Sequence, residues 1–311
     1  MPIASPQTPP PEPDAEIRPE HAATRPASGQ DAPALGTSAS DAETPDGLDA
    51  ALASRLRVVL VGTQHPGNIG SAARAIKTMG FGRLVLVAPE RFPHADAAAL
   101  AAGAGDVLEA AAIHATLAEA IADCRLVMGC TARSRRVALD ELAPWQAAAR
   151  GRETAAVGGE VALVFGRERT GLDNDELQLC HAAVHIPANP GYSSLNLAAA
   201  VQVLAYELRI GWAAEGATGR AGPVTGVRDA AQDGDEPPAT HAQLEGFFSQ
   251  LADTLDAIDF HKGRTPDSAM RKLRRIFLRA ELDDREVRIL RGVLADAQRM
   301  ARLAGERDGG R

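Results

Sequence analysis

The chain has 311 residues, of which 45% are hydrophobic and 24% charged, and its formal net charge is −8 at pH 7. Nine acidic residues and two arginines lie in residues 1–50, so this segment supplies seven of the eight net negative charges. The rest of the chain is nearly neutral, and the acidic total therefore does not exclude a nucleic-acid partner. No uninterrupted apolar run reaches the roughly 20 residues of a membrane span, which argues against an integral membrane protein.

Residues 1–53 form the first predicted segment, a disordered tail. Ten of the chain's 20 prolines lie in residues 1–50, where large apolar side chains are few. Such a segment buries too little apolar surface to offset the entropy cost of ordering it. It also lacks a basic region followed by an apolar stretch, so the sequence does not predict a signal peptide.

The chain has three cysteines, Cys124, Cys130 and Cys180, without the CxxC spacing of redox and zinc motifs. Two of them border apolar, strand-like runs. We interpret all three as structural thiols in a reducing cytoplasm. Cys180 lies near His181 and His185, but their spacing fits no common metal site, and no metal is predicted.

Residues 54–215 alternate between strand-like and helix-like segments. The strand-like runs are short, apolar and rich in β-branched residues, and they cover 56–61, 83–88, 124–129, 161–166 and 182–187. Continuous apolar runs are typical of parallel strands that are covered on both faces. The predicted helices cover 69–80, 97–103, 116–123, 138–149 and 173–181, and a long one begins near Ser193. The sequence therefore predicts an α/β fold with a mostly parallel sheet.

A flexible linker and a small all-helical domain are predicted after the α/β domain. Residues 216–240 are rich in Gly, Ala, Asp and Pro, as linkers are. In residues 241–305, apolar spacing predicts three amphipathic helices. From 262 to 302, twelve basic residues stand against six acidic ones, and the densest cluster is RKLRRIFLR at 271–279. Either a solvated helix face or a phosphate-contacting surface fits this pattern.

Three glycine-bearing loops follow predicted strands. The first, VGTQHPGNIGSAARAIKTMG, lies where a dinucleotide-binding loop would, but its G-x₄-G-x₂-G spacing, with Pro66 inside the turn, disfavours a dehydrogenase. The second is VFGRERTGL (164–172), and the third is IPANPGYSSLNLAAAV (186–201). Motifs of α/β-hydrolases and P-loop NTPases are missing from the sequence. In the third loop, Ser193, Ser194 and Asn196 are either helix caps or ligand-binding groups.

Together, HPGNIGSAARAIKTMG, LVFGRERTGL and IPANPGYSSLNLAAAVQVLAYELR resemble the three signature motifs of the SPOUT RNA methyltransferases, over residues 55–215. They are most similar to the motifs of the bacterial tRNA 2′-O-ribose methyltransferases that act on cytidine or uridine at nucleotide 32 of the anticodon loop. The resemblance implies a trefoil-knotted α/β fold with S-adenosyl-L-methionine as cofactor and tRNA as substrate. It also implies a cytoplasmic homodimer that needs no metal.

The resemblance further implies roles for individual residues. Arg74 matches the essential first-motif arginine. Because a guanidinium stays protonated, we expect it mainly to clamp the target ribose and its phosphate. The family's second role for this arginine, assisting deprotonation of the hydroxyl, stays open. Ser194 and Asn196 are the other candidate catalytic residues, which orient the hydroxyl or the arginine. The remaining expected roles are cofactor binding by Cys130, Thr131, Ala132, Gly166, Ile186, Ser193, Ser194 and Leu195, loop geometry by Asn68, Glu168 and Gly171, and RNA binding by Arg271, Lys272, Arg274 and Arg275.

Two alternatives stay open at the level of sequence. One is a sister SPOUT enzyme that methylates ribosomal RNA or another tRNA position, although the long C-terminal extension disfavours the minimal enzymes of the wobble nucleotide. The other is a non-catalytic RNA-binding protein with a degenerate knot. The presence of Arg74, Glu168, Ser194 and Asn196 disfavours this second alternative.

Overall fold

The structure is a computed structural model that describes residues 47–132, 139–213, 237–263 and 265–308. Most of the predicted tail and of the predicted linker lies outside these residues. Within them, every helix is too short or too polar to cross a lipid bilayer.

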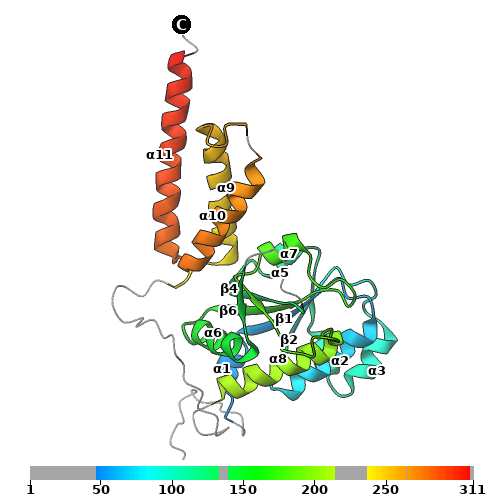
Figure 1. The fold of residues 1–311 in the computed structure, drawn as a ribbon. Helices are drawn as coiled ribbons and strands as arrows, with labels where there is room; N and C mark the ends of the chain where they lie inside the picture. The colour runs from blue at the N-terminus through cyan, green and yellow to red at the C-terminus, as the bar shows by residue number, and fades with distance from the viewer. Residues whose placement is uncertain (1–46, 133–138, 214–236, 264, 309–311) are drawn as a thin grey trace, which may run out of the picture. The chain divides into compact units, whose positions relative to one another are not determined.

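A parallel sheet forms the centre of the α/β domain (Figure 1). In the described part of the chain it has seven strands in the order β3-β2-β1-β6-β4-β7-β5, and every neighbouring pair is parallel. The strands are β1 (Leu56–Val61), β2 (Arg83–Val87), β3 (Ala112–His114), β4 (Cys124–Cys130), β5 (Asp140–Leu142), β6 (Glu160–Phe165) and β7 (Ala182–Val184). The predicted parallel sheet is thus confirmed.

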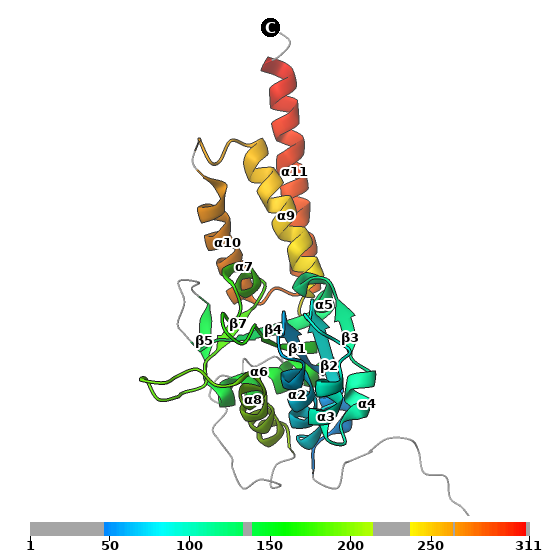
Figure 2. The same ribbon diagram turned by 90° about the vertical axis from the view of Figure 1, so that its right-hand side faces the viewer.

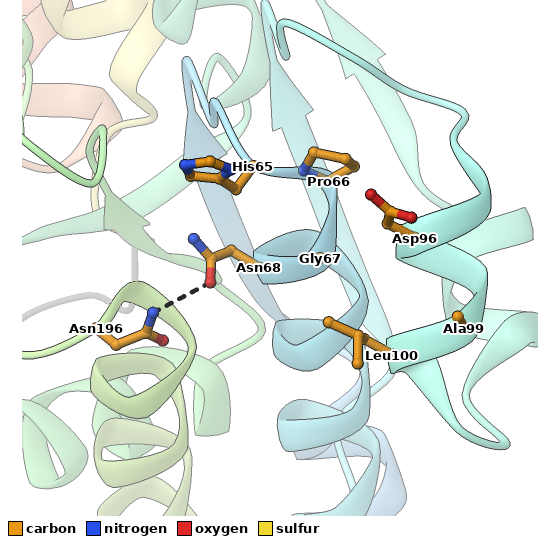
Figure 3. A pocket seen from close by; sticks show the side chains of 8 residues that line it. All are labelled: His65, Pro66, Gly67, Asn68, Asp96, Ala99, Leu100 and Asn196. Carbon is orange, nitrogen blue, oxygen red and sulfur yellow. Dashed lines mark hydrogen bonds between the residues drawn. The ribbon is translucent and has the colours of Figure 1, made fainter.

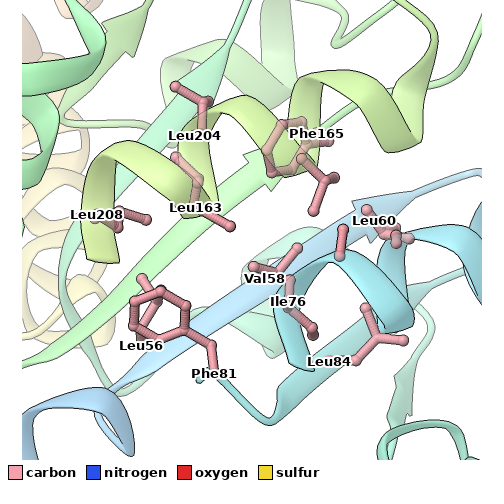
Figure 4. Close-up of a cluster of buried hydrophobic side chains, with 14 of the residues drawn as sticks. Leu56, Val58, Leu60, Ile76, Phe81, Leu84, Leu163, Phe165, Leu204 and Leu208 are labelled. Carbon is pink, nitrogen blue, oxygen red and sulfur yellow. The ribbon is translucent and has the colours of Figure 1, made fainter. Parts of the chain in front are cut away.

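Helices cover both faces of this sheet, and β1 shows why its sequence is apolar throughout. Leu56, Val58 and Leu60 enter one buried cluster, while Val59 and Val61 enter the cluster on the opposite face. Figure 4 shows the first cluster, which α2 and α8 cover. The helices of the domain are α1 (Ala50–Ala53), α2 (Pro66–Thr78), α3 (Ala95–Ala101), α4 (Gly105–Glu109), α5 (Leu117–Ala120), α6 (Pro144–Ala156), α7 (Asn174–Gln178) and α8 (Leu197–Trp212).

The strand order brings distant loops together at one edge of the sheet. Strand β6 lies between β1 and β4, so the loops that follow β1 and β6 start from adjacent strands. Helices α2 and α8 lie side by side in Figures 1 and 2, so the loop before α8 reaches the same edge. In open α/β sheets, ligands bind outside the carboxyl ends of the strands, where the strand order reverses.

Several features of the α/β domain differ from the prediction. The long helix does not begin near Ser193: α8 begins at Leu197, and Asn196 is its N-cap, with its side-chain oxygen accepting from Ala198 N and Ala199 N. Helix α4 was not predicted, and the helix predicted over 138–149 begins only at Pro144, because residues 140–142 form strand β5. Strands β3 and β5 were not predicted either. They have three residues each, with exposed or half-buried side chains, so they lack a continuous apolar run.

The ordered domains extend beyond their predicted boundaries. Leu48, which the prediction places in the tail, is 1% exposed and forms a bridge with Ala213. Ala239, in the predicted linker, is buried, and Thr240 caps the helix that follows. Buried residues at both boundaries therefore belong to the folded parts of the chain.

Three helices make up the C-terminal domain, α9 (His241–Ala257), α10 (Pro266–Ala280) and α11 (Asp284–Asp308). Their core is aromatic: Phe247 and Phe277 meet edge to face with ring centroids 4.8 Å apart, and Phe248 packs against both. Such pairs stabilise a core beyond the area that they bury.

Candidate active site

The loop that leads from β1 into α2 is held by a carboxylate from a different loop. The N-cap residue of α2, His65, makes no capping hydrogen bond with its side chain, and Pro66 follows it. Glu168 occupies this place instead: it accepts hydrogen bonds from Gln64 N at 3.0 Å and His65 N at 3.0 Å. A negative charge is favourable at a helix N-terminus, where backbone N–H groups lack partners.

The same contacts keep Glu168 ionised. Burial alone would raise the pKa of its carboxyl, but hydrogen bonds from the Asn68 side chain and from His65 N and Gln64 N outweigh burial and hold this pKa below its usual value. A carboxylate with a low pKa and occupied lone pairs is a poor proton acceptor. Its geometry suits the predicted role of fixing the loop.

Asn68 connects this carboxylate to the third loop. Its side-chain nitrogen donates to Glu168 at 3.0 Å, and its side-chain oxygen accepts from Asn196 Nδ2 at 3.2 Å (Figure 3). Asn196 in turn caps α8. One chain of hydrogen bonds, Glu168–Asn68–Asn196, thus joins the three motifs that the sequence singles out.

The turn after β6 needs glycine at two positions. A Cβ on Gly166 would lie 2.1 Å from Gly171 C and from Leu172 N, because the chain folds back across it. Gly171 donates to Arg167 O at 2.8 Å and has φ +68, which glycine adopts without strain. This tight turn aims Glu168 at the first loop.

The predicted cofactor-binding residues lie at or after the carboxyl ends of three adjacent strands. Cys130 ends β4 and Thr131 follows it, Gly166 follows β6, and Ile186 lies two residues after β7. Thr131 N donates to Val184 O at 3.0 Å, which ties β4 to β7. Burial raises the pKa of the Cys130 thiol to about 12, so the Cys130 side chain is an uncharged thiol at neutral pH. Of the others, Ala132, Ser194 and Leu195 are exposed, and Ser193 is half-buried.

Arg74 lies on α2, six residues after Asn68, and its side chain is exposed. Within the described residues its guanidinium makes no hydrogen bond or ion pair. Six residues correspond to a rise of about 9 Å along a helix. A long arginine side chain can cover much of that distance toward a ligand bound at the N-terminal ends of α2 and α8. The guanidinium is available to an external anion.

A pocket of about 560 Å³ opens beside the hydrogen-bond chain. It has the volume of small-molecule sites in general. Figure 3 shows its lining, which comes from the first turn of α2, from α3 and from the N-cap of α8: His65, Pro66, Gly67, Asn68, Asp96, Ala99, Leu100 and Asn196.

Comparisons with known proteins show the family of the chain. Residues 55–206 match the SpoU rRNA Methylase family, and residues 242–306 match the C-terminal domain of the tRNA methyltransferase TrmJ. The chain is 48% identical to the tRNA (cytidine/uridine/adenosine-2′-O-)-methyltransferase TrmJ of Pseudomonas aeruginosa over 248 residues, which cover 80% of this chain and 95% of that protein. It is 49% identical to the tRNA (cytidine/uridine-2′-O-)-methyltransferase TrmJ of Salmonella typhimurium over 243 residues, 78% of this chain and 96% of that one.

The chain belongs to the TrmJ family of methyltransferases. A solved structure agrees: TrmJ from Z. mobilis ZM4 superposes with a TM-score of 0.64 at 35% identity and covers 77% of this chain and 97% of its own. The predicted resemblance and the predicted fold class are both confirmed. The knot stays an implication of the family.

The predicted RNA-binding residues of α10 fall into two groups in this TrmJ-family chain. Arg271, Lys272 and Arg275 are exposed. Arg274 is 16% exposed, pairs with Glu245 and lies 4.4 Å above the Phe248 ring. Burial lowers the pKa of Arg274 to about 10. In the structure, Arg274 holds α10 against α9, and its three neighbours face solvent.

Sequence reasoning missed the α3 side of the pocket. Asp96 and Leu100 belong to no motif, and only the fold places α3 beside the start of α2. One signal was present: Gly67 and Gly70 both face α3, and a Cβ on Gly70 would lie 2.0 Å from Ala97 O. The spacing of these glycines marks a close helix contact.

We expect Glu168→Gln to loosen the first loop. A glutamine has one acceptor oxygen, and its amide nitrogen would face the donors of Gln64 and His65. We expect a loss of about 1–2 kcal/mol in the free energy of unfolding, discounted for partial exposure, and a fall in the methyl-transfer rate. Because the folded pKa is lowered, the stabilisation by Glu168 is complete above its usual value of 4.5 and is lost as the pH falls through the folded pKa.

Urea denaturation at pH 7 and below pH 4.5 measures this difference. The control is Glu90→Gln, because the Glu90 carboxylate accepts only from the half-buried Gln64 side chain, at 3.0 Å. Glu90 meets the loop backbone through its own backbone N–H, which donates to Thr63 O and is unchanged in this variant. Equal stabilities of the Glu168 and Glu90 variants at pH 7 would contradict the role of Glu168.

Proposed function

We propose that this TrmJ-family protein transfers a methyl group from S-adenosyl-L-methionine to the ribose 2′-hydroxyl of nucleotide 32, a cytidine or uridine, in the anticodon loop of tRNA. The observation that carries the proposal is the Glu168–Asn68–Asn196 chain, which joins three motif loops beside a pocket. Arg74, which has no side-chain partner among the described residues, lies on the helix that follows the first of these loops. The names of the relatives from Pseudomonas and Salmonella support the reaction type and the tRNA substrate.

The residues present fit a cofactor at the carboxyl ends of β4, β6 and β7. Cys130, Thr131 and Ile186 are half-buried and uncharged there, and the buried Gly166 brings no side chain to this end of β6. Ser193 and Leu195 come from the loop before α8. When bound, the cofactor supplies a methyl group that is already activated as a sulfonium, and the proposed reaction needs no metal.

The protein's own part in the reaction is positioning. Arg74 binds the phosphate and ribose of the target nucleotide, which holds the 2′-hydroxyl near the methyl group. Ser194 is exposed in the loop before α8 and orients the 2′-hydroxyl by a hydrogen bond, while the proton that the hydroxyl loses passes to solvent. The Asn196 oxygen is already used to cap α8, so Asn196 fixes the loop that carries Ser194.

The C-terminal domain contributes tRNA binding through α10. Its exposed Arg271, Lys272 and Arg275 neutralise backbone phosphates, which gives affinity without sequence preference. We further propose that the protein acts as a homodimer in the cytoplasm. The proposed dimer is supported by two exposed aromatic side chains, Trp145 on α6 and Tyr206 on α8, helices that contact each other.

Replacing Arg271, Lys272 and Arg275 together by glutamate is expected to weaken tRNA binding and to lower the salt slope of log K by about 2, since each lost phosphate contact removes about 0.7–0.9. Filter binding of tRNA at several salt concentrations gives this slope. Arg274→Gln serves as the contrasting variant: it is expected to lower thermal stability through the lost Glu245 pair while the slope changes less. If the triple variant had the same salt slope of log K as the wild type, the proposal that α10 binds tRNA would be wrong.

Nucleoside mass spectrometry tests the proposed reaction. Unmodified tRNA transcripts are incubated with the full chain and the cofactor, digested and mapped. A ribose methyl at nucleotide 32 is the expected result. A ribose methyl at another position, or on ribosomal RNA, would keep the chemistry and contradict the assigned nucleotide. Cofactor binding without methylation of any RNA would contradict the proposed function.

A further inference from the structure

The pocket beside the hydrogen-bond chain has one wall that no motif supplies. Helix α3 contributes Asp96, Ala99 and Leu100, opposite the first turn of α2 (Figure 3). A Cβ on Gly67 would lie 2.7 Å from Leu100 Cδ1, so glycine at 67 lets the Leu100 side chain lie against α2. Leu100 nevertheless stays 51% exposed, which leaves an apolar surface open to a ligand.

The charges around the pocket disfavour a phosphate in it. The N-terminus of α2 would ordinarily attract an anion, but Glu168 already occupies that position. Asp96 adds a second carboxylate to the lining. A phosphate group would be repelled by both, whereas a neutral group with N–H donors would not.

The polar side chains of the pocket differ in how many of their hydrogen-bonding atoms already have partners in the protein. Asn68 and Asn196 hydrogen-bond to each other, and each has a further partner. Asp96, in contrast, has an exposed carboxylate whose nearest basic group is His94 Nδ1 at 3.5 Å. That nitrogen accepts from Asp96 N at 3.1 Å, so the contact between the two residues runs through the Asp96 backbone and leaves the carboxylate oxygens as acceptors.

The remaining surfaces are flat or apolar. The ring of Pro66, the imidazole of His65 and the Leu100 side chain line the pocket, and within the described residues the His65 ring has no hydrogen-bond partner. Apolar faces with a polar group at the edge suit a nucleobase, because a base has apolar faces and hydrogen-bonding edges.

We propose that this pocket receives the base of the methylated nucleotide and that Asp96 selects bases with an exocyclic amino group. The carboxylate accepts from the amino group of cytosine or adenine, whereas the O4 atom of uracil offers it no proton. Asp96 is therefore a specificity-determining residue that favours cytidine over uridine. This inference rests on the proposed ribose methylation and adds the base preference to it.

Single-turnover methylation of two tRNA transcripts that differ only in cytidine or uridine at the target nucleotide tests the proposal. The substitution Asp96→Asn keeps the size and shape of the side chain, but the amide offers a hydrogen-bond donor as well as an acceptor to the base. We expect the ratio of kcat/KM for cytidine to that for uridine to fall by about threefold to tenfold, the range for one hydrogen bond. The fall comes from slower cytidine methylation with uridine methylation retained or raised.

Asp106→Asn is the matched control. Asp106, like Asp96, is an exposed aspartate at the second position of a short helix, α4, but it pairs with Lys77 and does not line the pocket. For the Asp106→Asn variant, the ratio of kcat/KM for cytidine to that for uridine should equal the wild-type ratio. A second pocket variant, Leu100→Ala, changes an exposed side chain and should raise KM for both transcripts without changing their ratio by much.

The outcomes separate the two proposals. Methylation by the wild type with an unchanged ratio in Asp96→Asn would overturn the base pocket and leave the proposed function intact. No methylation of either transcript by the wild type would overturn the proposed function itself. A reduced ratio in Asp96→Asn but not in Asp106→Asn would support the assignment of Asp96.

Discussion

Replacing Arg74 by alanine is expected to slow methyl transfer by about 100-fold or more, while the affinity for S-adenosyl-L-methionine stays nearly the same. The loss is large because the guanidinium has no partner within the described residues, so its binding energy is available to hold the target ribose and phosphate. Its exposure on α2 means that the fold does not depend on it.

Rapid-quench measurement of the first turnover, together with calorimetric titration of the cofactor, separates these effects. Lys77→Ala is the control: Lys77 lies one turn further along α2 and pairs with Asp106. It should leave the rate within a few-fold of the wild type. If the Arg74→Ala variant transferred the methyl group as fast as the wild type, the proposed site of transfer beside α2 would be wrong.

Gly166→Ala is expected to give the largest change in stability. The new methyl group would lie 2.1 Å from two backbone atoms, Gly171 C and Leu172 N, and backbone yields less easily than a side chain. We expect a loss of about 3 kcal/mol or more in the free energy of unfolding, or a refolded turn that no longer aims Glu168 at the first loop. In either case methyl transfer should be lost.

Urea denaturation and cofactor titration measure both consequences. Gly82→Ala is the matched control, because a Cβ there meets nothing within 4 Å. It should change the stability by less than about 1 kcal/mol. If the Gly166 variant were as stable and as active as the Gly82 variant, the tight turn would not be needed.

Much of the fold could be predicted from the sequence, because buried parallel strands leave continuous apolar runs. Strand β1 matches its predicted range of 56–61. Strands β3 and β5 could not be predicted, since three exposed or half-buried residues leave no such run. The burial of Leu48 could not be predicted either, because one apolar residue in a proline-rich segment gives no periodic signal and only a tertiary contact buries it.

The candidate site could be predicted in part. The motif residues Asn68, Glu168 and Asn196 are brought together, yet the start of α8 was placed too early because serines are as good N-caps as asparagine. Arg274 shows a different limit. In sequence it looks like its neighbours, and only the packing of α10 on α9 buries its side chain and pairs it with Glu245.

The hydrogen bond between Asn68 and Asn196 joins residues 128 positions apart. A chain that grows on the ribosome from its N-terminus has made the whole first loop, and Asn68 with it, long before the partner exists. Until Asn196 emerges, the first loop lacks its third-loop contact, and the sheet order places the later strand β6 between β1 and β4. The nascent protein therefore cannot hold a complete site until more than 60% of its residues have been joined.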